Sequence, residues 1–175
     1  MFETCLSSAQ IFTGKLLRVR VDQVRLSNGR ESAREVVEHP GAVAILPVEG
    51  DGTLVLVRQF RYAVGKTLLE VPAGTREPNE PAEQCAVREL REETGLAARQ
   101  MELLTRFYVS PGWCTEELLV YRARDLREVG AEPEGDEILS IERIRPEQVP
   151  ALIASGDIAD AKTLTAILAH LADAG

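Results

Sequence analysis

The sequence predicts a mixed α/β fold, and three observations carry that prediction. Short apolar runs of strand length recur between residues 17 and 122, a charged segment with helical spacing interrupts them, and two helical stretches close the chain. At 175 residues the chain suits one domain with a real core, and its 45% hydrophobic and 27% charged content is ordinary for a globular protein. Periodicity by itself leaves α/β and α+β arrangements open.

The first 40 residues are predicted to form a separate β region. Apolar and polar side chains alternate over residues 17–22, which indicates a half-buried strand. Ser27-Asn28-Gly29-Arg30 is a strong hairpin turn, and a second strand is expected over residues 34–38. We therefore expect a β hairpin within residues 1–40, followed by the main domain over residues 41–175.

The main domain is predicted to contain a sheet flanked by helices. Continuous apolar runs favour buried strands, and the expected strands are 42–48, 53–60, 68–71, 106–109, 118–122 and 138–144. An acidic, polar stretch over residues 125–136 is expected to be a long loop. Residues 146–154 and 161–172 have the pattern of helices.

The most informative segment for chemistry lies between residues 74 and 96. Glu89, Glu92 and Glu93 are spaced i, i+3 and i+4, so on a helix their carboxylates share one face, with Cβ atoms about 5–6 Å apart. Three like charges placed in this way repel one another, and a hard divalent cation with oxygen ligands would convert that repulsion into attraction. The spacing therefore indicates a metal site.

The same segment carries start and stop signals for a helix. Pro81 suits the first turn, where its missing N–H costs little, and Gly95 suits the left-handed position that ends a helix. The alternative is a solvated face on which Arg88 and Glu92 form surface pairs worth a few tenths of a kcal/mol. The complete pattern, which includes Gly74 and Arg88, favours the metal site.

The pattern resembles the Nudix box, G-x5-E-x7-R-E-U-x-E-E-x-G-U, in which U is aliphatic, and every constrained position matches. The resemblance implies an α/β/α sandwich with a mixed sheet, and hydrolysis of a nucleoside diphosphate linked to another group. It also implies Mg²⁺ as cofactor, with Mn²⁺ as a possible substitute. The metal ligands would be the carboxylates of Glu89, Glu92 and Glu93 and the backbone carbonyl of Ala73.

Two further box residues are assigned supporting roles. Arg88 is positively charged and cannot ligate a metal, so we expect it to orient a box carboxylate from behind. Glu80 precedes the helix and is expected to brace the loop before it. We expect both Arg88 and Glu92 to be catalytic residues.

The segment around Pro111 narrows the range of expected substrates. Pro111 lies 16 residues after Gly95 in a Ser-Pro-Gly loop, which resembles the ADP-ribose pyrophosphatase group, and the likeness continues through residues 57–62 and 69–74. This implies hydrolysis of ADP-ribose to AMP and ribose 5-phosphate. Another nucleotide sugar such as GDP-mannose, or a dinucleoside diphosphate, stays open because residues 14–17 lack the aromatic that some relatives stack on adenine. A third alternative is a non-catalytic sensor of ADP-ribose.

The same resemblance suggests residues that contact the substrate. Arg61 would contact the diphosphate, Arg34 and Glu35 the adenine, and Glu116 the terminal ribose. The full expected set is Arg34, Glu35, Arg61, Glu70, Pro111 and Glu116. The alternatives are that Arg61 is a surface strand residue and that Arg34 and Glu35 form an exposed pair on the hairpin.

The general base is expected outside the box. In the ADP-ribose pyrophosphatase group it comes from an acidic loop before the last strand, and here that loop offers Glu134, Asp136 and Glu137. Glu137 ranks first because it directly precedes the strand that begins at Ile138. The alternative is an ordinary solvated acidic loop.

Composition excludes several other classes of protein. The formal net charge of −8 argues against a nucleic-acid surface, which needs a basic stripe. No run approaches 18 apolar residues, so no membrane span is expected, and the first residues lack the pattern of a signal peptide. The expected location is the cytoplasm. By resemblance, the expected assembly is a homodimer that shares the N-terminal β region.

Overall fold

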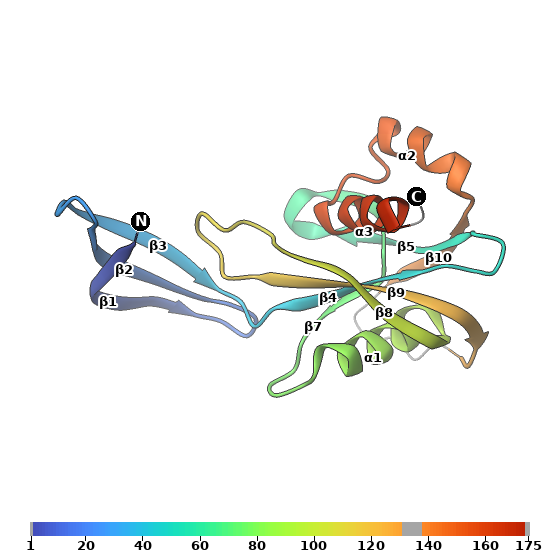
Figure 1. Ribbon diagram of the computed structural model, residues 1–175, viewed down its shortest axis with the longest axis horizontal. Coiled ribbons are helices and arrows are strands. Elements are labelled where there is room, and N and C mark those ends of the chain that lie inside the picture. The colour runs from blue at the N-terminus through green and yellow to red at the C-terminus, as the bar shows by residue number, and fades with distance from the viewer. Residues whose placement is uncertain (1, 131–137, 174–175) are drawn as a thin grey trace. The chain divides into compact units, whose positions relative to one another are not determined.

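The computed structural model describes residues 2–130 and 138–173 and confirms the α/β class (Figure 1). Contacts divide the chain into two compact units. The first comprises Met1–Gly41 together with Phe107–Glu117, and the second comprises Ala42–Arg106 together with Leu118–Gly175. The stretch 107–117 lies within the 41–175 region of the division made from sequence, and by its contacts it groups with the N-terminal strands.

The first unit contains an antiparallel three-stranded sheet in the order β1-β2-β3. Its strands are β1 (Glu3–Thr13), β2 (Arg18–Leu26) and β3 (Glu31–Glu38). The expected hairpin is β2–β3, and Gly29 adopts a φ of 83° in its turn. The sequence analysis did not predict β1, because every residue of this strand is exposed and it forms through pairing with β2.

The loop between β8 and β9 belongs to the same unit. Val37 donates its backbone N–H to the carbonyl of Trp113 at 2.8 Å, and Val37 in turn accepts a hydrogen bond from Thr115 N at 2.9 Å. A parallel bridge joins Val37 to Cys114. The loop therefore pairs with the last residues of β3, and no local sequence pattern indicates this pairing.

The second unit contains two sheets. One is an antiparallel sheet in the order β10-β5-β6, and the other is a mixed sheet in the order β7-β4-β9-β8, in which β4 runs parallel to β9 and antiparallel to β7. The strands are β4 (Ala42–Pro47), β5 (Leu54–Arg61), β6 (Lys66–Glu70), β7 (Ala73–Thr75), β8 (Leu96–Tyr108), β9 (Glu117–Glu128) and β10 (Leu139–Ile144).

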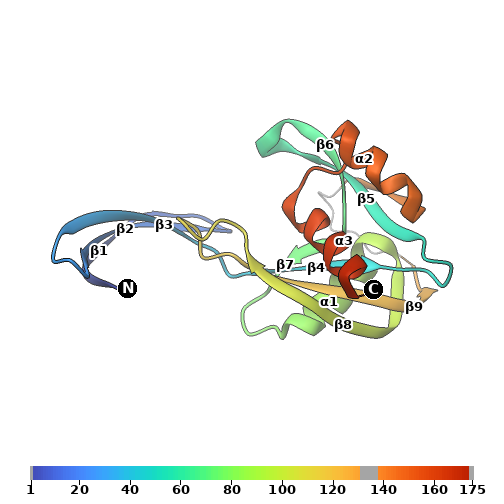
Figure 2. The same ribbon diagram turned by 45° about the horizontal axis from the view of Figure 1, so that its top comes forward.

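Helices cover both sides of β4 (Figure 1). The helices of this unit are α1 (Ala82–Thr94), α2 (Val149–Ser155) and α3 (Ala161–Asp173), with short 3₁₀ turns η1 (Tyr62–Val64) and η2 (Pro146–Gln148), and α1 and α3 are the two that contact β4. Val43 and Ile45 of β4 pack with Leu90 of α1 in the core, while α3 contacts β4 from the other side. The segment between α2 and α3 runs beside β6, where Leu69 N donates to the carbonyl of Asp157 at 2.8 Å (Figure 2).

Three elements differ from the sequence prediction. The chain enters β8 at Leu96, directly after the helix-ending Gly95 with φ 68°, ten residues before the expected strand. β9 continues to Glu128, past the expected start of the long loop. A short strand, β7, covers residues 73–75, where no strand was expected. In each case pairing within the mixed sheet β7-β4-β9-β8, rather than local periodicity, determines the structure.

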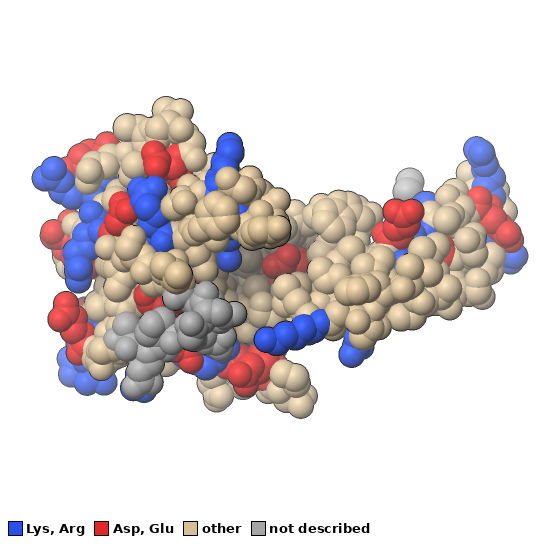
Figure 3. All heavy atoms as spheres, turned by 180° about the vertical axis from the view of Figure 1, so that it is seen from behind, with Lys and Arg blue, Asp and Glu red and all other residues tan. Residues whose placement is uncertain are grey.

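Charge on the surface is mixed. On the face drawn in Figure 3, lysine and arginine side chains are interspersed with aspartate and glutamate over the second unit. Every helix within the described residues is too short or too polar to cross a lipid bilayer.

Candidate active site

The box segment builds a tight contact between Gly74 and Glu89. A Cβ atom placed on Gly74 would lie 1.8 Å from Oε1 of Glu89 and 1.9 Å from its Cδ. Only glycine therefore permits the carboxylate of Glu89, which is buried on α1, to lie against the backbone of β7.

Glu93 meets the same short strand one helical turn later. Its Oε2 accepts a hydrogen bond from the backbone N–H of Ala73 at 3.2 Å, and the side chain is buried. The spacing of four residues on α1 directs Glu89 and Glu93 to the same side of the helix. Both carboxylates consequently converge on Ala73–Gly74, which is the backbone segment for which the sequence predicted a metal-ligating carbonyl.

Arg88 forms ion pairs with three carboxylates of the box segment. Its Nη1 donates to Glu89 Oε1 at 2.6 Å and to Glu92 Oε2 at 2.9 Å. Its Nε and Nη2 form a two-pronged pair with the carboxylate of Glu80 at 2.9 and 3.0 Å. The guanidinium thus fixes two carboxylates of α1 relative to the loop that precedes the helix.

Glu80 is held as an anion by these contacts. The hydrogen bond from Arg88 is the largest influence and lowers the pKa of Glu80 to about 2, against a smaller opposing effect of burial. Glu80 Oε2 also accepts the backbone N–H of Glu77 at 3.0 Å, and its carbonyl accepts the side chain of Arg76. Glu80 therefore stabilises the loop over residues 76–80 through these hydrogen bonds and through its ion pair with Arg88.

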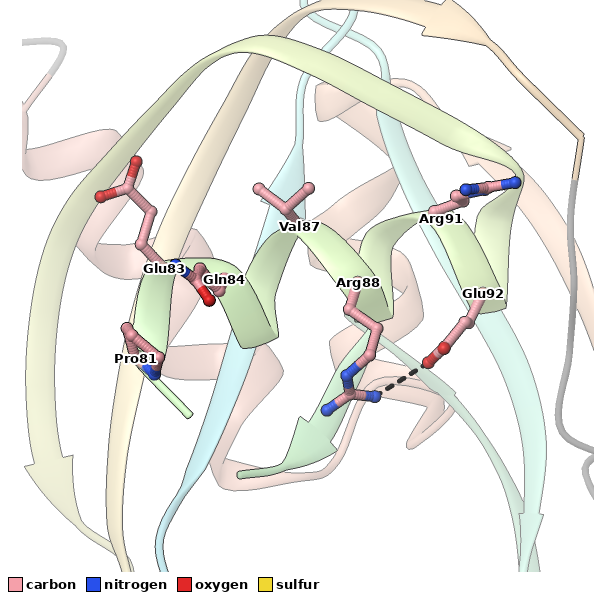
Figure 4. Close-up of a pocket in the computed structure, with 7 residues that line it drawn as sticks. All are labelled: Pro81, Glu83, Gln84, Val87, Arg88, Arg91 and Glu92. Atoms are coloured by element: carbon pink, nitrogen blue, oxygen red, sulfur yellow. Dashed lines mark hydrogen bonds and ion pairs between the residues drawn. The ribbon is translucent and has the colours of Figure 1, made fainter. Parts of the chain in front are cut away.

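The outer face of α1 borders a hollow of about 610 Å³. Figure 4 shows Arg88 and Glu92 directed toward each other on this face. The residues lining the hollow are Pro81, Glu83, Gln84, Val87, Arg88, Arg91 and Glu92. Glu92 lines this hollow, whereas Glu89 and Glu93 point to the β7 side.

The predicted metal ligands fit a hard divalent cation by their chemistry, because all of them are oxygen donors. The three carboxylates have different partners in this structure. Glu89 and Glu92 both form ion pairs with Arg88, whereas Glu93 accepts a hydrogen bond from the backbone N–H of Ala73. Within residues 2–130 and 138–173, no three His, Cys, Asp or Glu side chains converge into a set that could hold a metal ion.

Arg61 and Glu70 form a second charged cluster in the same unit. Arg61 donates from Nε and Nη2 to the carboxylate of Glu70 at distances of 2.6 to 3.1 Å. Lys162, at the start of α3, also contacts Glu70 Oε2, and it pairs with Asp160 at 2.9 Å. The sequence analysis named Arg61 and Glu70 and missed Lys162 and Asp160.

Glu70 stays charged although only 1% of its surface is exposed. Burial is the largest influence and by itself would raise its pKa, but the hydrogen bond from Arg61 and the charge of Lys162 outweigh it, so the pKa of Glu70 falls below its ordinary value. In turn, Glu70 raises the pKa of Arg61, and smaller contributions come from the charges of Glu93 and Asp160.

The other predicted substrate residues lie in the first unit. Arg34 forms an ion pair with Glu3 at 2.7 Å and also contacts Ser32. Glu116 Oε1 lies 4.0 Å from His39 Nδ1. Pro111 and Glu35 are exposed, and they stand on the β8–β9 loop and on β3 respectively. The three candidate bases Glu134, Asp136 and Glu137 lie outside the described residues.

The two residues that sequence reasoning missed left only a weak signal. Asp160 accepts the backbone N–H of Thr163 at 3.1 Å, as a helix N-cap does, so an Asp before a helical stretch was visible. The contact of its partner Lys162 with Glu70, 92 residues earlier in the chain, was not visible.

Comparison with known proteins places the chain in a family. The NUDIX domain family model matches residues 38–167, and a model described as the nucleoside diphosphate sugar hydrolase N-terminal domain matches residues 3–37. A curated relative named ADP-ribose pyrophosphatase, from Bacillus subtilis (strain 168), is 41% identical over 167 residues, which are 94% of this chain and 90% of the relative. A second relative, named methanol dehydrogenase activator, from Bacillus methanolicus, is 37% identical over 167 residues, which are again 94% of this chain and 90% of the relative.

A solved structure supports the fold. The structure titled "Crystal structure of ADP compounds hydrolase" superposes with a TM-score of 0.87, covering 98% of this chain and 94% of that one, at 24% sequence identity. At that identity the likeness establishes the fold alone. Because the domain model spans most of the chain and includes the complete box, this protein belongs to the Nudix family and is a Nudix diphosphatase.

Proposed function

We propose that this protein hydrolyses ADP-ribose to AMP and ribose 5-phosphate. The observation that carries the proposal is the convergence of two buried carboxylates, Glu89 and Glu93, on the Ala73–Gly74 backbone. The substrate is supported by the extended likeness to the ADP-ribose pyrophosphatase of Bacillus subtilis.

Nudix hydrolases generally use divalent metals, and we propose Mg²⁺ here, with Mn²⁺ as a substitute. The residues that would hold it are Glu89, Glu92, Glu93 and the carbonyl of Ala73. A divalent ion held there supplies positive charge that offsets the negative charge building on the phosphate oxygens. Arg88 keeps Glu89 and Glu92 in place through hydrogen bonds of 2.6 and 2.9 Å.

The remaining groups bind the substrate and move a proton. Arg61 keeps 40% of its side chain exposed, so it can donate to the substrate diphosphate while Glu70 holds its other edge. Water attacks one phosphorus, its proton passes to a carboxylate of the acidic loop, and the bridging oxygen leaves with the other product. Glu137 is the first candidate for that base, ahead of Glu134 and Asp136.

The N-terminal unit is proposed to recognise adenine and to mediate a homodimer in the cytoplasm. Arg34 and Glu35 offer a donor and an acceptor on β3, and Glu116 with Pro111 would face the terminal ribose. The exposure of apolar side chains in this unit supports a partner surface, since Phe12 and Trp113 are each about half exposed.

The decisive experiment is a substrate panel. Purified protein with Mg²⁺ is incubated with ADP-ribose, GDP-mannose and a dinucleoside polyphosphate, and the products are identified by mass spectrometry. ADP-ribose should give AMP and ribose 5-phosphate with the highest kcat/KM. A tenfold preference for either competitor, about 1.4 kcal/mol in transition-state binding, would show that the substrate is another nucleotide. Binding without turnover would instead identify a sensor.

A further inference from the structure

Glu70 is a buried carboxylate that two cations from different elements share. It ends β6, three residues before Ala73, and both Arg61 of β5 and Lys162 of α3 contact its oxygens. An ion in a low-dielectric interior is costly unless it is fully paired, and removal of one partner leaves charge uncompensated. Glu70 therefore divides its single negative charge between the two cations.

Lys162 is itself fixed by its surroundings. Its side chain is 14% exposed, and its Nζ lies 2.9 Å from Asp160 Oδ1. The same Asp160 oxygen accepts the backbone N–H of Thr163, and the Thr163 hydroxyl accepts the backbone N–H of Val71 at 2.9 Å. Hydrogen bonds thus join the start of α3 to the chain segment that leads from Glu70 to Ala73.

Arg61 is the other cation on Glu70, and its Nε and Nη2 both donate to that carboxylate. Without Lys162, Arg61 would be the main counterion of the negative charge of Glu70. Arg61 would then be more strongly neutralised, and less of its charge would act on a bound diphosphate.

We propose that Lys162, held by Asp160, is a positioning residue that shares Glu70 with Arg61 and so keeps the Arg61 guanidinium available for the substrate diphosphate. This inference rests on the proposed function for its diphosphate ligand. It assigns to α3, 92 residues after Glu70, a role in substrate affinity.

The competing explanation is that the cluster only anchors α3. Measuring ligand binding, rather than stability, distinguishes this explanation from the proposed positioning role. Dissociation constants are determined by calorimetry in EDTA, which prevents metal-dependent turnover, for ADP-ribose and for methylenediphosphonate as a diphosphate probe. The full-length variants are Lys162→Met, Lys162→Arg, the double variant Glu70→Gln/Lys162→Met, and Lys66→Met as a control that removes an exposed lysine from β6.

Lys162→Met should weaken binding of both ligands about tenfold, the scale expected when one charge interaction beside a ligand is lost. Lys162→Arg, which keeps the charge, should stay within about threefold of wild type, as should Lys66→Met. The double variant should recover most of the affinity, because Glu70→Gln removes the charge that Lys162 balances.

Three outcomes would overturn the inference. Wild-type affinity in Lys162→Met with a lowered Tm would mean that the cluster only anchors the helix. An equal loss in Lys66→Met would indicate a general charge effect. A double variant as weak as Lys162→Met would show that Lys162 does not act through Glu70. If the wild type binds methylenediphosphonate but not ADP-ribose, the proposed substrate fails, and the probe still tests Lys162.

Discussion

Replacing Gly74 by alanine isolates the contact that places Glu89. Gly74 does not have a positive φ, so alanine can adopt its backbone conformation, and only the added methyl group perturbs the site. That methyl would lie 1.8 Å from Glu89 Oε1, whereas ordinary contacts begin at 3.4 Å, so the carboxylate must retreat by about 1.6 Å. The movement would also disturb the 2.6 Å hydrogen bond from Arg88.

The expected cost is catalytic rather than structural. Misplacement of a reacting group by about 1 Å can cost about 100-fold in rate, which corresponds to about 2.7 kcal/mol in the barrier. The end of a glutamate side chain can move without unfolding the protein, so the Tm should change little. Gly50→Ala is the matched control, since a methyl group there meets nothing within 4 Å and the backbone has no positive φ.

The assay is steady-state hydrolysis of ADP-ribose with saturating Mg²⁺, accompanied by thermal unfolding of each variant. Gly74→Ala should lose about 100-fold in kcat, and Gly50→Ala should match wild type. A Gly74→Ala enzyme with more than a third of wild-type kcat would refute the reasoning, because Glu89 would then tolerate the displacement. A large fall in Tm would show that the contact serves folding instead.

The remaining predictions concern other charged groups. Glu93→Gln should lower kcat by orders of magnitude because it removes the charge of a proposed metal ligand, whereas exposed Glu83→Gln should not; equal losses would point to a failing helix. Arg34→Ala should raise KM for ADP-ribose far more than it lowers kcat, as uniform binding requires, and an unchanged KM would remove it from the site. Glu137→Gln should lower kcat about 10²–10⁴-fold with little change in Mg²⁺ affinity; near-normal kcat would place the base elsewhere. The pKa of Glu80 is depressed from 4.5 to about 2, so its stabilisation is complete above pH 4.5 and is lost as pH falls toward 2. The Tm advantage of wild type over Glu80→Gln should therefore shrink across that window, and a constant difference would contradict the assignment.

Much of the box could be predicted because its information is local. The spacing of Glu89 and Glu93 on one helix face, the helix end at Gly95 and the buried strands β4 and β5 all follow from residues close in sequence. The need for glycine at position 74 was part of the recognised pattern. The reason for this need is visible only in the tertiary structure, because a Cβ atom at position 74 would lie 1.8 Å from Glu89 Oε1.

β1 and the first ten residues of β8 were missed for the opposite reason. β1 has no buried residue and β8 begins with residues common in helices, so neither segment has the alternation that marks a half-buried strand. Each segment lies beside a neighbouring strand of its sheet, β2 for β1 and β9 for β8. Pairing energy of this kind depends on tertiary context rather than on propensity.

By itself, then, the sequence determined the family, the box helix and the chemical type of the metal ligands, since these depend on spacing within a single helix. The tertiary structure decided which charges meet between different elements. It paired Arg88 with Glu80 of the preceding loop, and it brought Lys162 onto Glu70 across 92 residues. Local periodicity records which face of an element is buried, but it carries no information about which distant side chain compensates a buried charge.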